Sequence, residues 1–386
     1  MGGWAAMSAT PRAEAVIDLE AIRDNVSMLR ARVGGRFVMA VVKADGYGHG
    51  ILQSAAAARA GGADWLGVAV IEEALALRAA GDTGPILSWL AAPGEDYRLA
   101  LKADVEVSAY SVPQLTEILA AARDSGQVAG VQLKVDSGLS RGGARLDEWP
   151  ALVQAARRAE LGGWVEITGI WSHFACSDEP EHPSVAGQEA AFRTALDIAA
   201  GAGLKPRVRH LANSAAVLTR ESAWFDLVRV GLAGYGLSPI PQLAGPAELG
   251  LTPAMTVRAQ VALTKRLAAG DGVAYGHTHV VDTDTNIALI PVGYGDGIPR
   301  HASNRAPVCI DGRWYRIAGR VSMDQFVVAT GDDRIEPGET VILFGSGEDG
   351  VPTAQDWAEA ADTIAYEIVT RIGGRVPRRY VGSLTR

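Results

Sequence analysis

The sequence contains little cysteine: its 386 residues include only Cys176 and Cys309, which lie far apart in the chain. Two cysteines at that separation provide neither a disulfide framework nor the spacing of a zinc site, so no metal site is predicted. No apolar run reaches the roughly 18 residues that a membrane-spanning helix needs. The first ten residues lack a basic region followed by an apolar one, which predicts no signal peptide. The expectation is a cytoplasmic protein without a membrane partner.

The chain also has fewer positively charged than negatively charged residues. The chain has 36 Lys and Arg against 44 Asp and Glu, which gives a net charge of -8. A negative net charge argues against nucleic acid as a partner. Hydrophobic residues make up 48% of the chain, so it can bury a sizeable core. The length favours two domains, or one large barrel with a small second domain.

Short strand patterns alternate with helical patterns through the first two-thirds of the chain. Such alternation is typical of parallel strands, and eight of them over about 200–250 residues predict a (β/α)8 barrel, similar to a TIM barrel. A doubly wound sheet is the alternative, but no GxGxxG motif follows a strand to support a dinucleotide site. The eight predicted strands are 37–42, 65–70, 85–90, 104–108, 131–135, 166–171, 207–211 and 227–230.

From about residue 252 the pattern changes to short β-patterned runs that are divided by glycine turns. Such runs predict a mostly β C-terminal domain. The expected organisation is a flexible N-terminal tail (1–12), a barrel (13–245) and a mostly β domain (246–386), with 13–19 as a strand that could join the second domain.

The last part of the chain carries a helical signal. A linker is expected over 239–253, and one helix over 353–372 is predicted to close the chain. Thr353 is the expected N-cap of this helix. Asp356, three residues on, is the expected partner in a capping box.

A lysine directly follows the first predicted barrel strand. Residues 37–42 are all apolar, which predicts a strand buried on both faces, and Lys43 then leads into a glycine-rich turn. Burial at a strand end lowers the pKa of an ammonium group, as a Schiff-base lysine requires. The structural alternative is an ordinary strand-end lysine whose ammonium group reaches the surface.

Other polar residues also follow predicted strands. In a barrel of this type the C-terminal ends of the strands share one rim, where active-site residues lie. Each residue has a structural alternative: His173 could be a core histidine, and Asn213 with Ser214 could cap a helix. Their shared rim favours a functional site. The rim residues are Lys43, Tyr47, Lys134, Asp136, Arg141, His173, His210, Asn213, Ser214, Arg229, Gly231 and Tyr235.

Several separate motifs recur in one order along nearly the whole chain, from about residue 15 to residue 378. The most specific is Ala-Val-Val-Lys-Ala-Asp-Gly-Tyr-Gly-His-Gly over 40–50. The others span 133–141, 169–175, 210–215, 228–237, 274–276, 293–297, 319–325 and 366–368. Together they resemble the alanine racemase family, which are fold-type III enzymes dependent on pyridoxal 5′-phosphate (PLP).

The resemblance implies a two-base racemisation with PLP as the electron sink. Lys43 would hold PLP and act as one acid/base on the substrate Cα, and Tyr275 would act on the opposite face. His173 would pack on the cofactor ring. Arg229 would donate to the pyridine nitrogen, which then stays largely unprotonated because an arginine does not readily release its proton. Further implied cofactor contacts are Tyr47, Asn213, Ser214, Gly231, Leu232 and Tyr366.

The resemblance also implies the substrate contacts. Arg141 would bind the PLP phenolic oxygen or the substrate carboxylate, and Met323 would offer its backbone N–H to that carboxylate. Lys134 can be carbamylated in this family, and the carbamate would orient Arg141. A narrow access channel for a small amino acid would be lined by Asp178, Tyr294, Arg300, Arg320 and Tyr366.

The same resemblance implies a homodimer in which Tyr275 and Met323 reach the site of the other subunit. The implied function is interconversion of L- and D-alanine, which supplies D-alanine for peptidoglycan. Two alternatives stay open: a non-catalytic PLP-binding protein and a fold-type III decarboxylase, which would need a cysteine such as Cys309. Departures from the family pattern at Ser322, Ala365 and Gly234 leave the preference for alanine over serine open.

Overall fold

The computed structural model of the chain describes residues 11–385 and divides it into two compact units. The barrel unit consists of Ile22–Gly46 and Ile51–Leu251, and the described part of the β unit consists of 11–21, Tyr47–Gly50 and 252–385. The tail predicted over 1–12 lies outside the described residues except for Pro11 and Arg12. Among residues 11–385, no helix combines the length and the apolar composition needed to cross a membrane.

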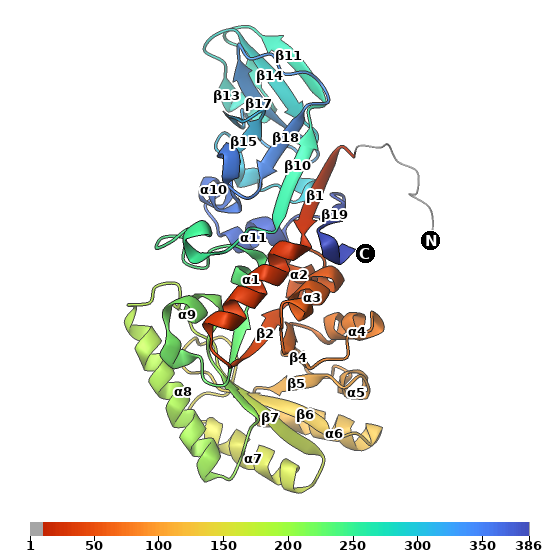
Figure 1. Ribbon diagram of the computed structural model, residues 1–386, viewed down its shortest axis with the longest axis vertical. Helices are drawn as coiled ribbons and strands as arrows, with labels where there is room; N and C mark the ends of the chain where they lie inside the picture. Colours follow the sequence, from red (N-terminus) through yellow and green to blue (C-terminus); the bar gives the residue numbers. More distant parts are fainter. Residues whose placement is uncertain (1–10, 386) are drawn as a thin grey trace. The chain divides into compact units, whose positions relative to one another are not determined.

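Eight parallel strands form the sheet of the barrel unit (Figure 1), in the order β8-β7-β6-β5-β4-β3-β2-β9. The two outermost strands, β8 and β9, are joined where Asp226 N donates to Arg209 O (3.1 Å) and Arg229 N donates to Ala212 O (3.0 Å). The sheet is therefore a nearly closed barrel, which confirms the predicted fold. Its strands are β2 (Phe37–Val41), β3 (Trp65–Val68), β4 (Ile86–Ser88), β5 (Glu106–Ala109), β6 (Ala129–Lys134), β7 (Val165–Trp171), β8 (Val208–His210) and β9 (Leu227–Val230).

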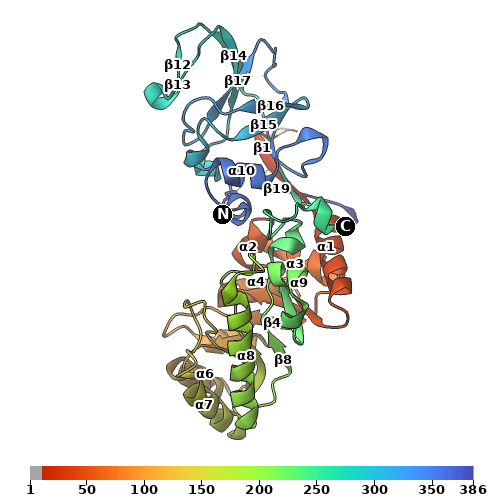
Figure 2. The same ribbon diagram turned by 90° about the vertical axis from the view of Figure 1, so that its left-hand side faces the viewer.

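Helices surround these strands (Figures 1 and 2), and every residue of β3, β4 and β9 is buried. Burial on both faces explains why the strands are short apolar runs rather than alternating patterns. The helices are α1 (Leu19–Arg32), which crosses into the β unit, α3 (Ile51–Ala60), α4 (Ile71–Ala79), α5 (Tyr97–Lys102), α6 (Val112–Ser125), α7 (Trp149–Leu161), α8 (Pro183–Gly201) and α9 (Ser214–Thr219).

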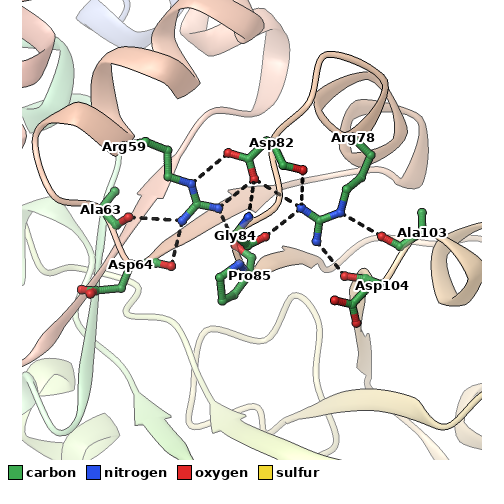
Figure 3. Close-up of polar contacts among 9 residues, drawn as sticks. All are labelled: Arg59, Ala63, Asp64, Arg78, Asp82, Gly84, Pro85, Ala103 and Asp104. Carbon is green, nitrogen blue, oxygen red and sulfur yellow. Dashed lines mark hydrogen bonds and ion pairs between the residues drawn. The ribbon is translucent and has the colours of Figure 1, made fainter.

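Two arginines and one aspartate organise the N-terminal ends of the strands (Figure 3). Arg59 of α3 donates to both carboxylate oxygens of Asp82, at 2.9 and 3.0 Å, and Arg78 of α4 donates to the same carboxylate at 3.3 Å. The two guanidinium groups also bind backbone carbonyls of Ala63, Asp64, Gly84, Pro85, Ala103 and Asp104, in the loops before β3, β4 and β5. The two side chains thereby link the loops that precede β3, β4 and β5.

We expect Asp82→Ala to lower the free energy of unfolding by about 2 kcal/mol, because two partly buried guanidinium groups lose their shared acceptor. Urea unfolding followed by circular dichroism measures this. Asp147→Ala is the matched control, since the Arg145–Asp147 pair is largely exposed and should contribute much less to stability. Equal losses in the two variants would contradict the prediction.

The β unit contains two main sheets and one short ribbon. The larger sheet has the order β16-β15-β18-β10-β1-β19, in which β1 runs antiparallel to β10 and parallel to β19. The smaller sheet has the order β11-β14-β17, and the β12–β13 ribbon projects from the body of this unit (Figure 2). The strands are β1 (Ala13–Asp18), β10 (Met255–Gln260), β11 (Leu263–Leu267), β12 (Gly272–Val273), β13 (His279–Val280), β14 (Thr285–Ile290), β15 (Pro307–Ile310), β16 (Arg313–Arg316), β17 (Phe326–Gly331), β18 (Thr340–Phe344) and β19 (Arg378–Val381).

The prediction of one closing helix over 353–372 is wrong. The chain instead forms α10 (Ala354–Ala360) and α11 (Ala365–Thr370), and then strand β19. Asp362 lies between the two helices with φ of 53°, a left-handed conformation that interrupts a right-handed helix. The predicted cap is confirmed: the Thr353 hydroxyl accepts from Asp356 N at 3.1 Å, and the Asp356 carboxylate accepts from Thr353 N at 2.7 Å.

Candidate active site

Lys43 follows β2 and begins a left-handed turn. Ala44, Asp45 and Gly46 have φ values of 53°, 53° and 61°, with ψ between 45° and 53°. L-amino acids with a side chain adopt this conformation at a cost of roughly 1–2 kcal/mol each. Backbone strain of this kind persists only where the surrounding structure holds it.

Two carboxylates hold the turn, one from α4 and one from the turn itself. The Glu73 carboxylate of α4 accepts from Ala44 N at 2.7 Å, and the Asp45 carboxylate accepts from Ile51 N at 2.9 Å. At Gly46, an added Cβ would lie 2.7 Å from the Ser54 hydroxyl. The turn therefore fixes the direction in which the chain leaves Lys43.

The two rim lysines have lowered pKa values. Burial lowers the pKa of Lys43, and the nearby Arg141 lowers it further, whereas Glu73 opposes the shift. Burial, with the charges of Arg229 and Arg141, lowers the pKa of Lys134 to about 7. Both amines are thus more readily neutral than a surface lysine, as nucleophilic or proton-accepting lysines must be.

Lys134 lies between aromatic rings. Its ammonium is 4.4 Å from the ring centre of Trp171 and 4.7 Å from that of Tyr110. The sequence analysis did not identify these two aromatic residues, although each stands at or just after a strand end. With Lys43, Arg141 and Arg229, Lys134 makes a rim whose field favours a bound anion.

Arg229 links two histidines in the barrel interior. Its Nη2 lies 3.1 Å from His173 Nδ1, and its Nη1 lies 3.0 Å from His210 Nδ1. A guanidinium group can only donate, so both Nδ1 atoms accept and each neutral ring carries its proton on Nε2. Burial and the charge of Arg229 hold the pKa of both histidines well below the usual range.

The starts of α9 and of the 3-10 turn Leu232–Tyr235 lie side by side. The Ser214 hydroxyl oxygen accepts from Gly231 N at 2.9 Å and from Ala233 N at 3.3 Å, which leaves its own O–H as a donor. Asn213 is the N-cap of α9, the structural role considered from the sequence, and its side chain accepts from Ala216 N at 3.2 Å. Hydroxyl and backbone N–H groups of this kind suit a phosphate.

Arg141 and Asp178 lie in loops after β6 and β7, and both are exposed. Arg141 follows Ser140, which has a φ of 57°. The Asp178 carbonyl accepts a hydrogen bond from the Gln242 side chain, which anchors its loop within the barrel unit.

The β unit presents its own group of predicted site residues. Tyr275 follows β12 and is 72% exposed. It lines a groove of about 240 Å³ together with Arg320, Ser322 and Gln325. The Arg320 guanidinium lies over Gly276, where an added Cβ would be 3.2 Å from Nη1.

Met323 is 53% exposed and its loop is bound to that of Tyr294. Tyr294 N donates to Ser322 O at 3.0 Å, and Gly295 N donates to Met323 O at 2.8 Å. Arg300 begins the following 3-10 turn, Arg300–Ala302, and is exposed. Within this unit Tyr47 and Tyr366 form a second pair, with ring centres 6.1 Å apart.

Sequence comparison identifies the family. The family model of the alanine racemase N-terminal domain matches residues 17–239, and that of the alanine racemase C-terminal domain matches residues 254–380. The chain belongs to the alanine racemase family. It is 57% identical to an alanine racemase of Frankia casuarinae over 96% of both chains, and 55% identical to one of Thermobifida fusca over 96% of this chain and 99% of that one.

Solved structures of alanine racemases agree with this assignment. The structure of the enzyme from Streptomyces lavendulae has a TM-score of 0.96 and 54% identity, and the match covers 97% of this chain and 98% of that chain. The enzyme from Streptomyces coelicolor A3(2) has a TM-score of 0.95 at 54% identity, over 96% of this chain and 98% of that chain.

The departures from the alanine racemase pattern have a structural basis at one position. Gly234 lines a cavity of about 10 Å³ with Val26, Ser54 and Val230, and an added Cβ would meet Val230 at 3.1 Å. Ser322 contacts the Tyr294 loop through its backbone carbonyl, which any residue could provide. The structure gives no reason for alanine at Ala365.

We expect Gly46→Ala to destabilise the turn after Lys43 by about 1–2 kcal/mol, because the new Cβ would meet the Ser54 hydroxyl at a positive φ. Thermal unfolding of the full chain measures the loss. Gly81→Ala is the control: its φ of 94° is also positive, but no atom lies within 4 Å of the added Cβ. The double variant Gly46→Ala/Ser54→Ala should recover part of the loss; no recovery would exclude the contact with Ser54 as its cause.

Proposed function

We propose that this chain interconverts L- and D-alanine with PLP held by Lys43. The amine of Lys43, with its lowered pKa at a cationic rim, is the observation that carries the proposal in a member of the alanine racemase family. PLP would supply an electron sink for the pair left when the substrate Cα loses its proton.

The residues around Lys43 fit an anionic cofactor with a phosphate group. Ser214 would donate its hydroxyl proton to the phosphate, and Leu232 would offer its backbone N–H beside it. Gly231 would support this contact, because its N–H donates to the Ser214 oxygen and leaves the hydroxyl proton for the phosphate. Tyr47 and Tyr366 are proposed as further hydroxyl donors, and Asn213 supports this segment as the cap of α9. The rim cations would offset the negative charge of the cofactor.

His173 and Arg229 are proposed to contact the cofactor ring. Because Arg229 donates to His173 Nδ1, the imidazole keeps its proton on Nε2, the atom that can face outward from Arg229. Arg229 would also donate to the ring nitrogen. The lowered pKa of His173 keeps this ring neutral at physiological pH.

Lys43 and Tyr275 are proposed as the two groups that move the Cα proton. An amine with a lowered pKa can accept a proton near neutral pH and return it. The phenol of Tyr275 would serve the opposite face. Its 72% exposure, with the 53% exposure of Met323, supports a site completed between subunits of a homodimer.

Substrate would be held by Arg141 and by the backbone N–H of Met323, and would pass residues that restrict its size. Arg141 is exposed in the loop after β6, and its charge acts on Lys43. The proposed access residues are Asp178, Tyr294, Arg300, Arg320 and Tyr366. A cytoplasmic supply of D-alanine for peptidoglycan is part of the same proposal.

The decarboxylase alternative is weakened by the position of its cysteine. Cys309 lies in β15, is 3% exposed, and sits in a strand paired on both sides. A residue enclosed in this way has no access to substrate.

We expect Tyr275→Phe to lower turnover of L-alanine by about 10²–10⁴-fold, as loss of one acid/base group does. We expect Lys43→Ala to abolish the absorbance of the covalently held cofactor.

If sites are shared, subunits of the two variants mixed in equal amounts should regain about a quarter of wild-type activity, because about half of the dimers are then mixed and each mixed dimer has one of its two sites intact. Chiral chromatography of alanine measures turnover. No recovery on mixing would contradict a shared site, and release of CO2 would favour the decarboxylase.

We expect Lys134 to react with CO2 when its amine is neutral, which forms a carbamate and releases one proton. Its pKa of about 7 lies below the usual 10.5, so the amine is mostly neutral at pH 8 and mostly charged at pH 6. ¹³C-labelled bicarbonate should therefore give a carbamate signal in the NMR spectrum at pH 8 that weakens at pH 6. The signal should be absent in Lys134→Met; a signal that survives this substitution would contradict the assignment.

A further inference from the structure

A chain of polar side chains, partly buried at Glu106 and fully buried beyond it, crosses the barrel interior behind Arg229. Glu106, the first residue of β5, accepts from Gln132 Nε2 at 2.6 Å. Gln132 Oε1 lies 2.6 Å from His210 Nε2, and His210 Nδ1 lies 3.0 Å from Arg229 Nη1. The chain thus runs from the N-terminal end of one strand to the interior of β9.

The hydrogen bonds of this chain can have only one direction. A carboxylate accepts and does not donate, so the Gln132 amide must turn its nitrogen toward Glu106 and its oxygen toward His210. His210 must then donate from Nε2 and accept at Nδ1. That acceptor is the one Arg229 needs, since a guanidinium group only donates.

The surroundings hold each member in place. The Glu106 carboxylate also accepts from Trp65 Nε1 at 3.2 Å and from Arg207 at 2.6 Å. Trp171 stacks on His210, with ring centres 5.7 Å apart and an angle of 2°.

A glycine makes room for the amide. At Gly169 of β7, an added Cβ would lie 2.7 Å from Gln132 Cδ. Burial raises the pKa of Glu106, which the donors from Gln132 and Arg207 oppose. The Gln132 amide stabilises the partly buried carboxylate by donating to it, and this bond fixes the direction in which the amide faces.

We propose that Glu106 and Gln132 are positioning residues for Arg229: the carboxylate fixes the amide, the amide fixes the His210 ring, and the ring holds one end of the guanidinium group. The expected effect on turnover rests on the proposed function. The positions of the protons on His210 and Gln132 do not depend on that function, and they can be measured without cofactor or substrate.

Glu106→Leu tests the proposal by removing the acceptor for Gln132. The amide is then free to turn its nitrogen toward His210, which would favour the Nδ1–H form and oppose the bond from Arg229. We expect the ¹⁵N spectrum of the His210 ring in the full chain to change from one Nε2–H form to a mixture. We also expect kcat for L-alanine to fall about 10-fold with KM nearly unchanged, as is typical when a residue that orients an active-site group is lost.

Two control variants distinguish a role in positioning Arg229 from a general effect on protein stability. Glu106→Gln keeps an acceptor oxygen for Gln132, and Arg207→Ala removes only the half-exposed ion-pair partner of Glu106; both should keep the wild-type His210 spectrum and kcat. If Glu106→Leu does not fold, Gln132→Met removes the amide at similar length and should show the same changes.

Several outcomes would overturn the proposal. They are an unchanged His210 spectrum in Glu106→Leu, a lower melting temperature without a change in kcat, or an equal loss of kcat in Arg207→Ala. If the wild-type chain shows the Nε2–H form but no racemisation, the proposed function fails while the proton arrangement stands.

Discussion

The guanidinium group of Arg229 is a buried cation that can only donate hydrogen bonds, and the polar interior of the barrel is arranged by that constraint. His173 and His210 must both accept from it through Nδ1. Backbone carbonyls of Ser172 and Leu211 accept from the same group at 2.8 and 3.0 Å. With these partners around it, Arg229 has a defined direction, and so do the Nε2 protons of the two histidines.

Charged side chains have different partners at the two ends of the barrel. At the N-terminal ends of the strands, Asp82 and loop carbonyls surround the guanidinium groups of Arg59 and Arg78, so charge there serves the fold. At the C-terminal ends, burial and then the charges of neighbouring arginines lower the pKa values of Lys43 and Lys134. A cluster of that kind is costly without an anion, and this cost is what makes the rim suitable for an anionic ligand.

Much of the barrel could be predicted because buried parallel strands are short apolar runs separated by helical patterns. The position of Lys43 after such a run also follows from the sequence. The closing helix was mispredicted because its apolar spacing continues through Asp362, whose left-handed conformation depends on its surroundings. The roles of Glu106 and Gln132 could not be predicted, since the two side chains become partners only through the pairing of β5 with β6.

The sequence by itself determined the alternation of strands and helices, the residues that follow each strand, and the family that those motifs resemble. These are local properties, set by apolar periodicity and by turn residues. Only the tertiary structure decided which nitrogen of His210 carries the proton and why the Gln132 amide faces as it does. Those features depend on Glu106, Gln132, His210 and Arg229, which lie on four different strands, and hydrogen-bond direction is fixed only when donors and acceptors meet in space.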